Sequence, residues 1–194
     1  MLSQPLVVVT LLGCVFGQLE HAVWLGSLLQ LLWMSSMLFG ANVPENDTVA
    51  SVVIAGTYFL FRPVTEISEP ALICLVILMG VPFSSLGRRI DIKLDQKNLD
   101  LVNRADSAAV QAGPKGLFSL GIIGLTRAFI AHGLVIAMGL FGCLFAVHTI
   151  APFLHASILE GLAVTGTYVI PALGLAVALT MLRKRRAMAV SAII

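Results

Sequence analysis

One segment, residues 25–51, constrains the fold of this chain more than any other, because an apolar run in it ends in a cluster of helix-breaking and polar residues. Gln30 and Trp33 lie in the apolar run, and the cluster that follows consists of Gly40, Asn42, Pro44, Glu45, Asn46 and Asp47. Lipid cannot satisfy free backbone N–H and C=O groups, so interrupted backbone beside an apolar segment indicates a cavity inside the protein. Many transporters place their substrate sites at such interruptions.

The composition indicates an integral membrane protein. Of the 194 residues, 58% are apolar and only 11% are charged, whereas a soluble domain usually has about 25% charged residues. The formal net charge of +2 comes from basic residues in short clusters beside apolar segments. This is the usual pattern of topology signals. The expected surrounding is therefore a lipid bilayer, and nucleic acid is not expected as a partner.

The apolar segments predict an all-α, polytopic membrane protein with broken or re-entrant helices, forming a single domain over residues 1–194. They lie at about residues 5–17, 22–39, 49–61, 70–86, 117–147 and 150–182. A crossing needs about 20 apolar residues, so the first three are short or marginal and the last two are longer than one crossing. Pro152 and Pro171 are candidate breaks in the last segment. Because both ends of the chain lie in apolar tracts, we also expect a shortened first span and a missing final segment.

A segment of different character, residues 87–116, alternates charged and apolar residues. From Arg89 to Gln111 it predicts an amphipathic helix at the membrane surface, which Gly113 and Pro114 would end. Its basic residues, and those at 183–186, place both regions on the cytoplasmic side. The chain between them is then expected to cross twice as an antiparallel pair that turns near residues 148–155.

The polar residues of the first half are candidates for binding a polyol. Gln30 either bonds a neighbouring helix or contacts such a ligand, and Trp33 is either an interfacial residue or a platform for a sugar ring. The amide and carboxylate groups of Asn42, Asn46 and Asp47 either form an exposed turn or bind sugar hydroxyls, which both donate and accept hydrogen bonds.

Two charged residues lie inside the long apolar segments, where charge is costly. Arg127 either extends toward the cytoplasm or pairs with a buried carboxylate or a partner subunit, and Glu160 either pairs with Arg127 or lines a path. His132 is predicted to be a satisfied core or packing residue. The sequence contains no recognisable phosphate loop, nucleophile motif or metal-binding motif. No catalytic residue, metal or cofactor is therefore predicted.

Residues 25–51 resemble the signature region of the membrane IIC component of mannose/sorbose-family sugar phosphotransferase systems. That family has an apolar run ending in L-x-W and then a G-A-x-V-P-P-D stretch, and the residues that match are Leu31, Trp33, Gly40, Ala41, Val43 and Pro44. Weaker matches are Gln4, Pro5 and Leu6, then Arg104, Ala105, Asp106, Ala108 and Ala109, then Leu125, Arg127 and Ala128.

The resemblance implies the sugar-translocating IIC subunit of a bacterial inner-membrane permease, forming a homo- or hetero-oligomer. Such a subunit pairs with a IID membrane subunit and binds sugar with it. Cytoplasmic IIA and IIB proteins phosphorylate the arriving sugar, and the IIC chain itself is non-catalytic. The implied sugar site comprises Gln30, Trp33, Asn42, Asn46 and Asp47.

The chain departs from the family pattern at two places. The P-P-D motif reads Pro44, Glu45 and Asn46, with Asp47 one position late, and Glu160 stands where an amide is more common. A short chain with these departures leaves a second interpretation open, that of a non-transporting membrane scaffold or a regulatory paralogue.

Overall fold

The regular structure of the described part of the chain is helical, which confirms the predicted fold class. A computed structural model describes residues 3–34, 44–111 and 113–191. Its α-helices are α1 (Pro5–Phe16), α2 (Leu19–Trp33), α3 (Asp47–Phe61), α4 (Glu69–Gly80), α5 (Pro82–Gln111), α6 (Gly113–Ile150), α7 (Ala156–Val164) and α8 (Ile170–Ser191). Two 3-10 turns (Arg62–Val64 and Ala151–Phe153) and one π-helical turn (Thr165–Val169) join some of them.

The first three helices are shorter than a full crossing and pack on one another, as predicted. They have 12, 15 and 15 residues, against the roughly 20 that a crossing needs. Gly17 ends α1 with a left-handed φ of 68°, and the N–H of Gln18 returns to the carbonyl of Gly13 at 2.8 Å. A Cβ on Gly13 would lie 2.0 Å from the Cβ of Ala22, so α1 and α2 form a hairpin that tolerates only glycine at this contact.

The apolar core surrounds α3, whose side chains are nearly all buried. Tyr58 and Phe59 of α3 pack there with Leu25 and Leu29 of α2 and Leu72 of α4. Burying each such apolar side chain stabilises the fold by about 1.5–3 kcal/mol. Because α3 packs against other helices along most of its surface, its short length does not expose the backbone groups at its ends to lipid.

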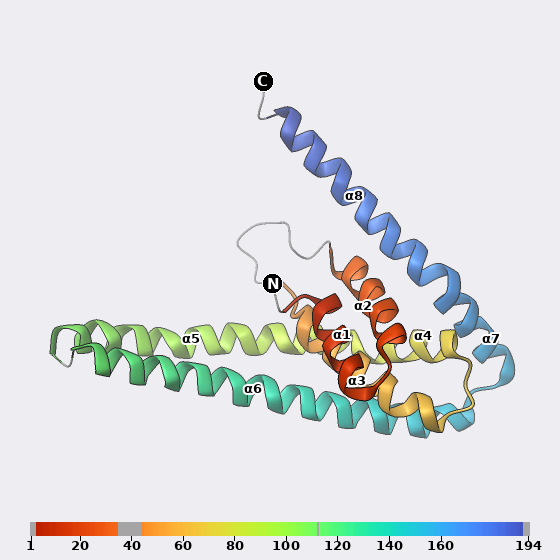
Figure 1. The fold of residues 1–194 in the computed structure, drawn as a ribbon, viewed down its shortest axis with the longest axis horizontal. Helices are drawn as coiled ribbons and strands as arrows, with labels where there is room; N and C mark the ends of the chain where they lie inside the picture. The colour runs from red at the N-terminus through yellow and green to blue at the C-terminus, as the bar shows by residue number, and fades with distance from the viewer. Residues whose placement is uncertain (1–2, 35–43, 112, 192–194) are drawn as a thin grey trace.

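Within the described residues, three helices are long and apolar enough to cross a membrane: Glu69–Ala105, Phe118–Phe153 and Ala156–Arg183. The first joins α4 and α5 into one nearly straight rod, along which α6 runs antiparallel (Figure 1). The rod stays straight through Pro82 because the N–H of Val81 still bonds the carbonyl of Ile77 at 2.9 Å. Proline is tolerated in the first turn of the helix that follows.

The amphipathic helix predicted for Arg89–Gln111 is present, and its place at the membrane surface stays a prediction. The segment is helical and amphipathic, but it continues the axis of α4 and turns apolar residues toward α6. Leu101, for example, is only 8% exposed and lies beside Gly124 of α6. Helical periodicity shows that one side of the segment is covered, and α6 packs against it.

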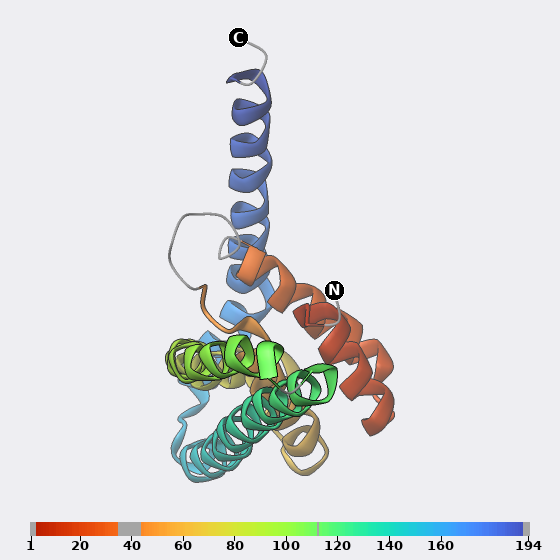
Figure 2. The same ribbon diagram turned by 90° about the vertical axis from the view of Figure 1, so that its left-hand side faces the viewer.

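The C-terminal helices leave the bundle after the predicted turn. The chain reverses at Ala151–Phe153, which contains Pro152, and the π-helical turn directly precedes Pro171. A Cβ on Gly166 would lie 2.1 Å from the carbonyl oxygen of Pro70, so this turn touches the start of α4 closely. From there α8 passes α2 and extends away from the other helices (Figure 2). The expected antiparallel pair therefore turns where predicted, but α6 and α8 diverge instead of packing together.

Candidate functional site

A polar cluster forms where the chain enters α3, and Asn46 is at its centre. The Oδ1 atom of Asn46 accepts the N–H of Val49 at 2.9 Å and so caps the helix. This leaves the Nδ2 group facing α5, where it donates to Oδ2 of Asp91 at 2.8 Å. The other Asp91 oxygen lies 2.7 Å from Nε2 of His132 on α6. We call Asn46, Asp91 and His132 the Asp91 cluster.

His132 faces an oxygen acceptor with each ring nitrogen. Its Nε2 atom contacts Asp91, and its Nδ1 atom lies 2.8 Å from the backbone carbonyl of Ala128. A doubly protonated ring satisfies both contacts, whereas a neutral ring has only one N–H to donate. The side chains of His132 and Asp91 are 28% and 27% exposed, so the pair is partly open to a ligand. His132 is thus a hydrogen-bonded histidine packed between helices, as the sequence predicted, and its partner Asp91 is partly exposed.

The backbone before α3 is anchored to the first turn of α5. The N–H of Asn46 donates to the carbonyl of Ser84 at 3.2 Å, and the Ser84 hydroxyl lies 3.1 Å from Oε2 of Glu45. The hydroxyl of Ser85 is 3.4 Å from the other Glu45 oxygen. A Cβ on Gly87 would lie 2.7 Å from the Cβ of Asn46, so only glycine lets the two segments approach. These contacts hold Asn46 at a fixed position beside Asp91.

The structure brings only part of the predicted sugar site into this cluster. Asp47 is the first residue of α3 and lies beside it, where its Oδ1 atom is 3.3 Å from the Thr48 hydroxyl. Asn42 falls outside the described residues. Gln30 accepts the backbone N–H of Leu6 at 3.4 Å, so it bonds a neighbouring helix, one of its two expected roles. Trp33 ends α2 on the wall of an apolar pocket of about 350 Å³.

The two predicted intramembrane charges lie far apart and do not pair. Arg127 is exposed on α6, in a groove that it shares with Lys97 and Asp100 of α5. Glu160 is exposed on α7, beyond the opposite end of α6. Across the described chain, the ion pairs within 4.0 Å join His21 to Glu69, Arg62 to Glu69 and His132 to Asp91.

A second polar cluster, which we call the Glu69 cluster, ties the starts of α2 and α4 to the end of α3. One Glu69 oxygen lies 2.6 Å from Nδ1 of His21 and accepts the Tyr58 hydroxyl at 2.7 Å. The other lies 3.9 Å from the Arg62 guanidinium, which also donates to Gln18 at 3.4 Å. Glu69 thus has three partners from three different elements. No motif in the sequence singles out Glu69.

Asp91 was also missed, and its signal in the sequence is weak. It lies between Ile90 and Ile92, two residues after Arg89, which made it one more charge on an amphipathic helix. Its partners Asn46 and His132 are 45 and 41 residues away in the chain. Among the described residues, no group of three His, Cys, Asp or Glu side chains is arranged to hold a metal ion. The groups that the Asp91 cluster presents are a carboxylate, an imidazole and an amide, with the first two partly exposed.

Comparison with known proteins places the chain in a family. A model of the family described as "PTS system sorbose-specific iic component" matches residues 1–193. A solved structure titled "Structure of membrane protein" is similar with a TM-score of 0.67 and 20% identity, over 93% of this chain and 70% of that chain, which shows a shared fold. None of the curated proteins matches the chain significantly. Because the family model covers nearly every residue, the chain belongs to this family of membrane IIC components of the sugar phosphotransferase system.

Proposed function

We propose that this IIC component is the sugar-translocating subunit of a bacterial inner-membrane permease and that it binds a hexose-type sugar at the Asp91 cluster. In this proposal a IID-like membrane subunit completes the complex. Cytoplasmic IIA and IIB proteins supply the phosphate, and IIB transfers it to the sugar as it arrives. Family membership supports the overall role. The observation that carries the site is that Asp91 bonds both Asn46, next to interrupted backbone, and His132.

The chemistry of the cluster suits a polyol. Asp91 accepts hydrogen bonds, His132 donates them, and both side chains are partly exposed. A sugar hydroxyl can donate to the remaining lone pairs of the carboxylate, and it can accept from the imidazole when it replaces Asp91 at Nε2. Asn46 stands where the family resemblance leads one to expect a carboxylate. Here its amide donates to Asp91, so two like charges are not forced together. On this basis the departure at Asn46 is compatible with a working site.

The position of the Asp91 cluster along the helices also supports a sugar site near the cytoplasmic boundary of the membrane. Asp91 follows Glu69 by 22 residues, or roughly 33 Å of helix. His132 precedes Ile150 by 18 residues, or roughly 27 Å. Both lengths are close to the ~30 Å of the hydrocarbon core. If the ends near Glu69 and Ile150 face outward, as the basic residues predict, the cluster lies where sugar would be handed to cytoplasmic phosphate carriers.

The remaining predicted residues have a place in the proposal as well. Asp47 adjoins Asn46, and Asn42 belongs to the same interrupted segment, so we retain both as sugar contacts. Substituting Asn42 by Ala should lower uptake without loss of the assembled complex. Gln30 and Trp33 have partners or surroundings elsewhere, so we expect their substitution to affect uptake less than changes at Asn46 or Asp91.

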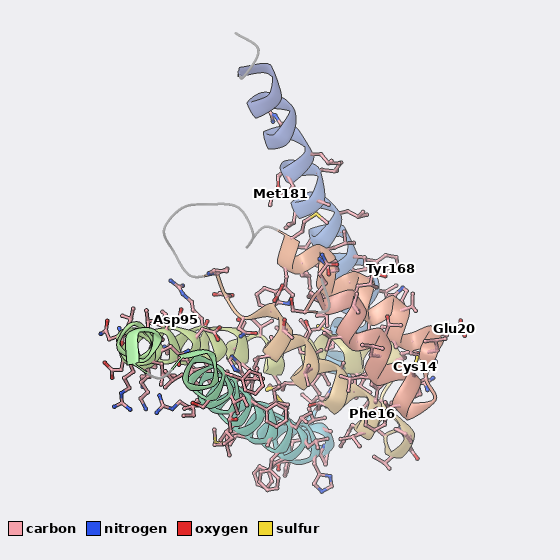
Figure 3. The ribbon with its side chains drawn as sticks, turned by 60° about the vertical axis from the view of Figure 1, so that its left-hand side comes forward. Cys14, Phe16, Glu20, Asp95, Tyr168 and Met181 are labelled. Carbon is pink, nitrogen blue, oxygen red and sulfur yellow. The ribbon has the colours of Figure 1, made fainter. Side chains whose placement is uncertain are left out.

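The test compares two aspartates on one helix. Cells express the chain with its neighbouring membrane subunit, and the accumulation of radiolabelled hexose phosphate is measured across a sugar panel. Asp91→Asn removes the charge that holds Asn46 and His132, whereas Asp95→Asn removes an exposed charge one turn further along α5 (Figure 3). We expect Asp91→Asn to lower accumulation by more than about tenfold, an energetic equivalent of ~1.4 kcal/mol, and Asp95→Asn to leave it near wild type.

Two outcomes would contradict the proposal. Unchanged uptake by an assembled Asp91→Asn complex would remove the Asp91 cluster from the sugar site. No uptake of any sugar by an assembled wild-type complex would instead favour the non-transporting scaffold.

A further inference from the structure

An apolar pocket separate from the Asp91 cluster lies between α2, the end of α4 and the C-terminal helices. Its volume is about 350 Å³, within the range of pockets that hold small ligands. One wall carries Trp33, a second carries Cys74 and Leu78, and the third is formed by the π-helical turn and by Leu173 of α8. Tyr168, labelled in Figure 3, marks this turn.

The lining offers little to a polar ligand. The hydroxyl of Thr165, the lining residue on the π-helical turn, donates to the carbonyl of Gly161 at 2.8 Å within its own helix. The Cys74 thiol is buried among apolar side chains. Apolar cavities of this kind do not retain water, because water there finds too few partners. The ligand that fits is therefore hydrocarbon.

The rim of the pocket continues into the outer apolar surface of the helices. Leu78 and Leu173 line the pocket and are still 58% and 53% exposed. Both belong to helices long and apolar enough to cross a membrane. The medium that meets these side chains in a bilayer is the acyl chains of lipid, so an acyl chain can enter without crossing a polar barrier.

We infer that this pocket is a binding site for one acyl chain of a membrane phospholipid, held between α2, α4 and α8. The site explains how α8, which leaves the bundle beside α2, is supported on its inner side. At the neighbouring contact, a Cβ on Gly174 would lie 3.0 Å from the Cβ of Leu31, so protein packs against protein there and lipid fills the space beside it. This inference does not depend on sugar binding.

Trp33 provides a direct reporter, because the chain has only two tryptophans. In a Trp24→Phe background, Trp33 is the single tryptophan, and Trp24 is exposed enough for this change to be mild. The protein, assembled with its neighbouring membrane subunit, is reconstituted in phosphatidylethanolamine–phosphatidylglycerol vesicles. One set of vesicles has ordinary acyl chains and the other has chains brominated near their middle, since bromine quenches tryptophan only at close contact. We expect brominated vesicles to remove most of the Trp33 emission.

A matched pair of variants separates the pocket from general contact with lipid. Leu173→Phe fills the pocket, whereas Leu175→Phe adds the same ring at an exposed position of α8 that does not line it. We expect Leu173→Phe to abolish most of the quenching and Leu175→Phe to retain it. Val81→Phe, from the opposite wall, repeats the test if Leu173→Phe does not fold.

Three results would overturn the inference. Trp33 emission that is insensitive to bromine would mean that no acyl chain reaches the pocket. Equal quenching in the two α8 variants would mean that Trp33 senses only surrounding lipid. Quenching that appears only when the neighbouring subunit is absent would mean that a protein segment fills the pocket in the complex.

Discussion

The Asp91 and Glu69 clusters contain the same kinds of groups but serve different parts of the molecule. Each has a carboxylate beside a histidine, and both carboxylates belong to the α4–α5 rod. Glu69 joins the end of α3 to the start of α2, where His21 lies 48 residues away along the chain, and arginine and tyrosine complete its contacts. Asp91 instead lies on the long helix α5 and joins it to the non-helical backbone before α3, through Asn46, and to the long helix α6, through His132. Exposure does not separate the two clusters, because the side chains of His21 and Glu69 are 29% and 39% exposed. We propose the ligand site at the Asp91 cluster because that cluster adjoins the interrupted segment before α3, and we expect the Glu69 cluster to maintain the fold because it ties α2, α3 and α4 together.

Among the variants that test the difference between the two clusters, Asn46→Asp is expected to have the largest effect. The substitution places a second carboxylate where an amide now donates to Asp91 at 2.8 Å. Like charges at such a distance cannot both remain ionised without a large penalty. We expect sugar accumulation to fall by more than about tenfold, or ~1.4 kcal/mol, and to recover partly as pH falls, because a shared proton restores a donor. Uptake that declines further at lower pH would contradict this explanation.

A change at the other cluster should affect stability and spare transport. Glu69→Ala removes the acceptor of the buried Tyr58 hydroxyl and the partner of His21 and Arg62. Leaving a buried hydroxyl unsatisfied costs about 1–3 kcal/mol, so the thermal midpoint of the purified complex should decrease. Glu66→Ala, at an exposed position three residues earlier, is the control. A Glu69→Ala complex that keeps its stability but no longer transports sugar would reverse the roles that we assign to the two clusters.

The smallest effect should come from Gly87→Ala, which tests the position of Asn46 without changing a polar group. The new methyl group would meet the Cβ of Asn46 at 2.7 Å and displace it from Asp91. Gly121→Ala, which adds the same group in open space on α6, is the matched control. We expect uptake to fall a few-fold, by about 1 kcal/mol of lost hydrogen bonding, in the first variant alone. Equal uptake in both variants would show that the geometry around Asn46 tolerates adjustment.

Much of the fold could be predicted from the sequence because hydropathy and helix-breaking residues are local signals. They predicted short helices before residue 61, two long segments after residue 117 and a break at Pro152, whereas the helix Ala156–Arg183 continues through the other candidate break, Pro171. They could not give the direction of the segment 89–111, since periodicity is the same whether lipid or α6 covers the apolar side. The site was predicted only in part, as Asn46 beside broken backbone. Asp91 and His132 join it through packing between helices distant in sequence.

The straightness of the α4–α5 rod has a mechanical consequence for both clusters. A rigid body that slides along its axis carries every attached group through the same distance, so such a shift would release Glu69 and Asp91 from their partners together. Bending at the Val81–Pro82 junction would instead move one end of the rod and leave the cluster at the other end in contact with its partners. The junction carries a proline, whose missing N–H makes it the weakest point of the rod. If the rod slides, the contacts of both clusters change together. If it bends, the contacts of one cluster change while those of the other stay in place.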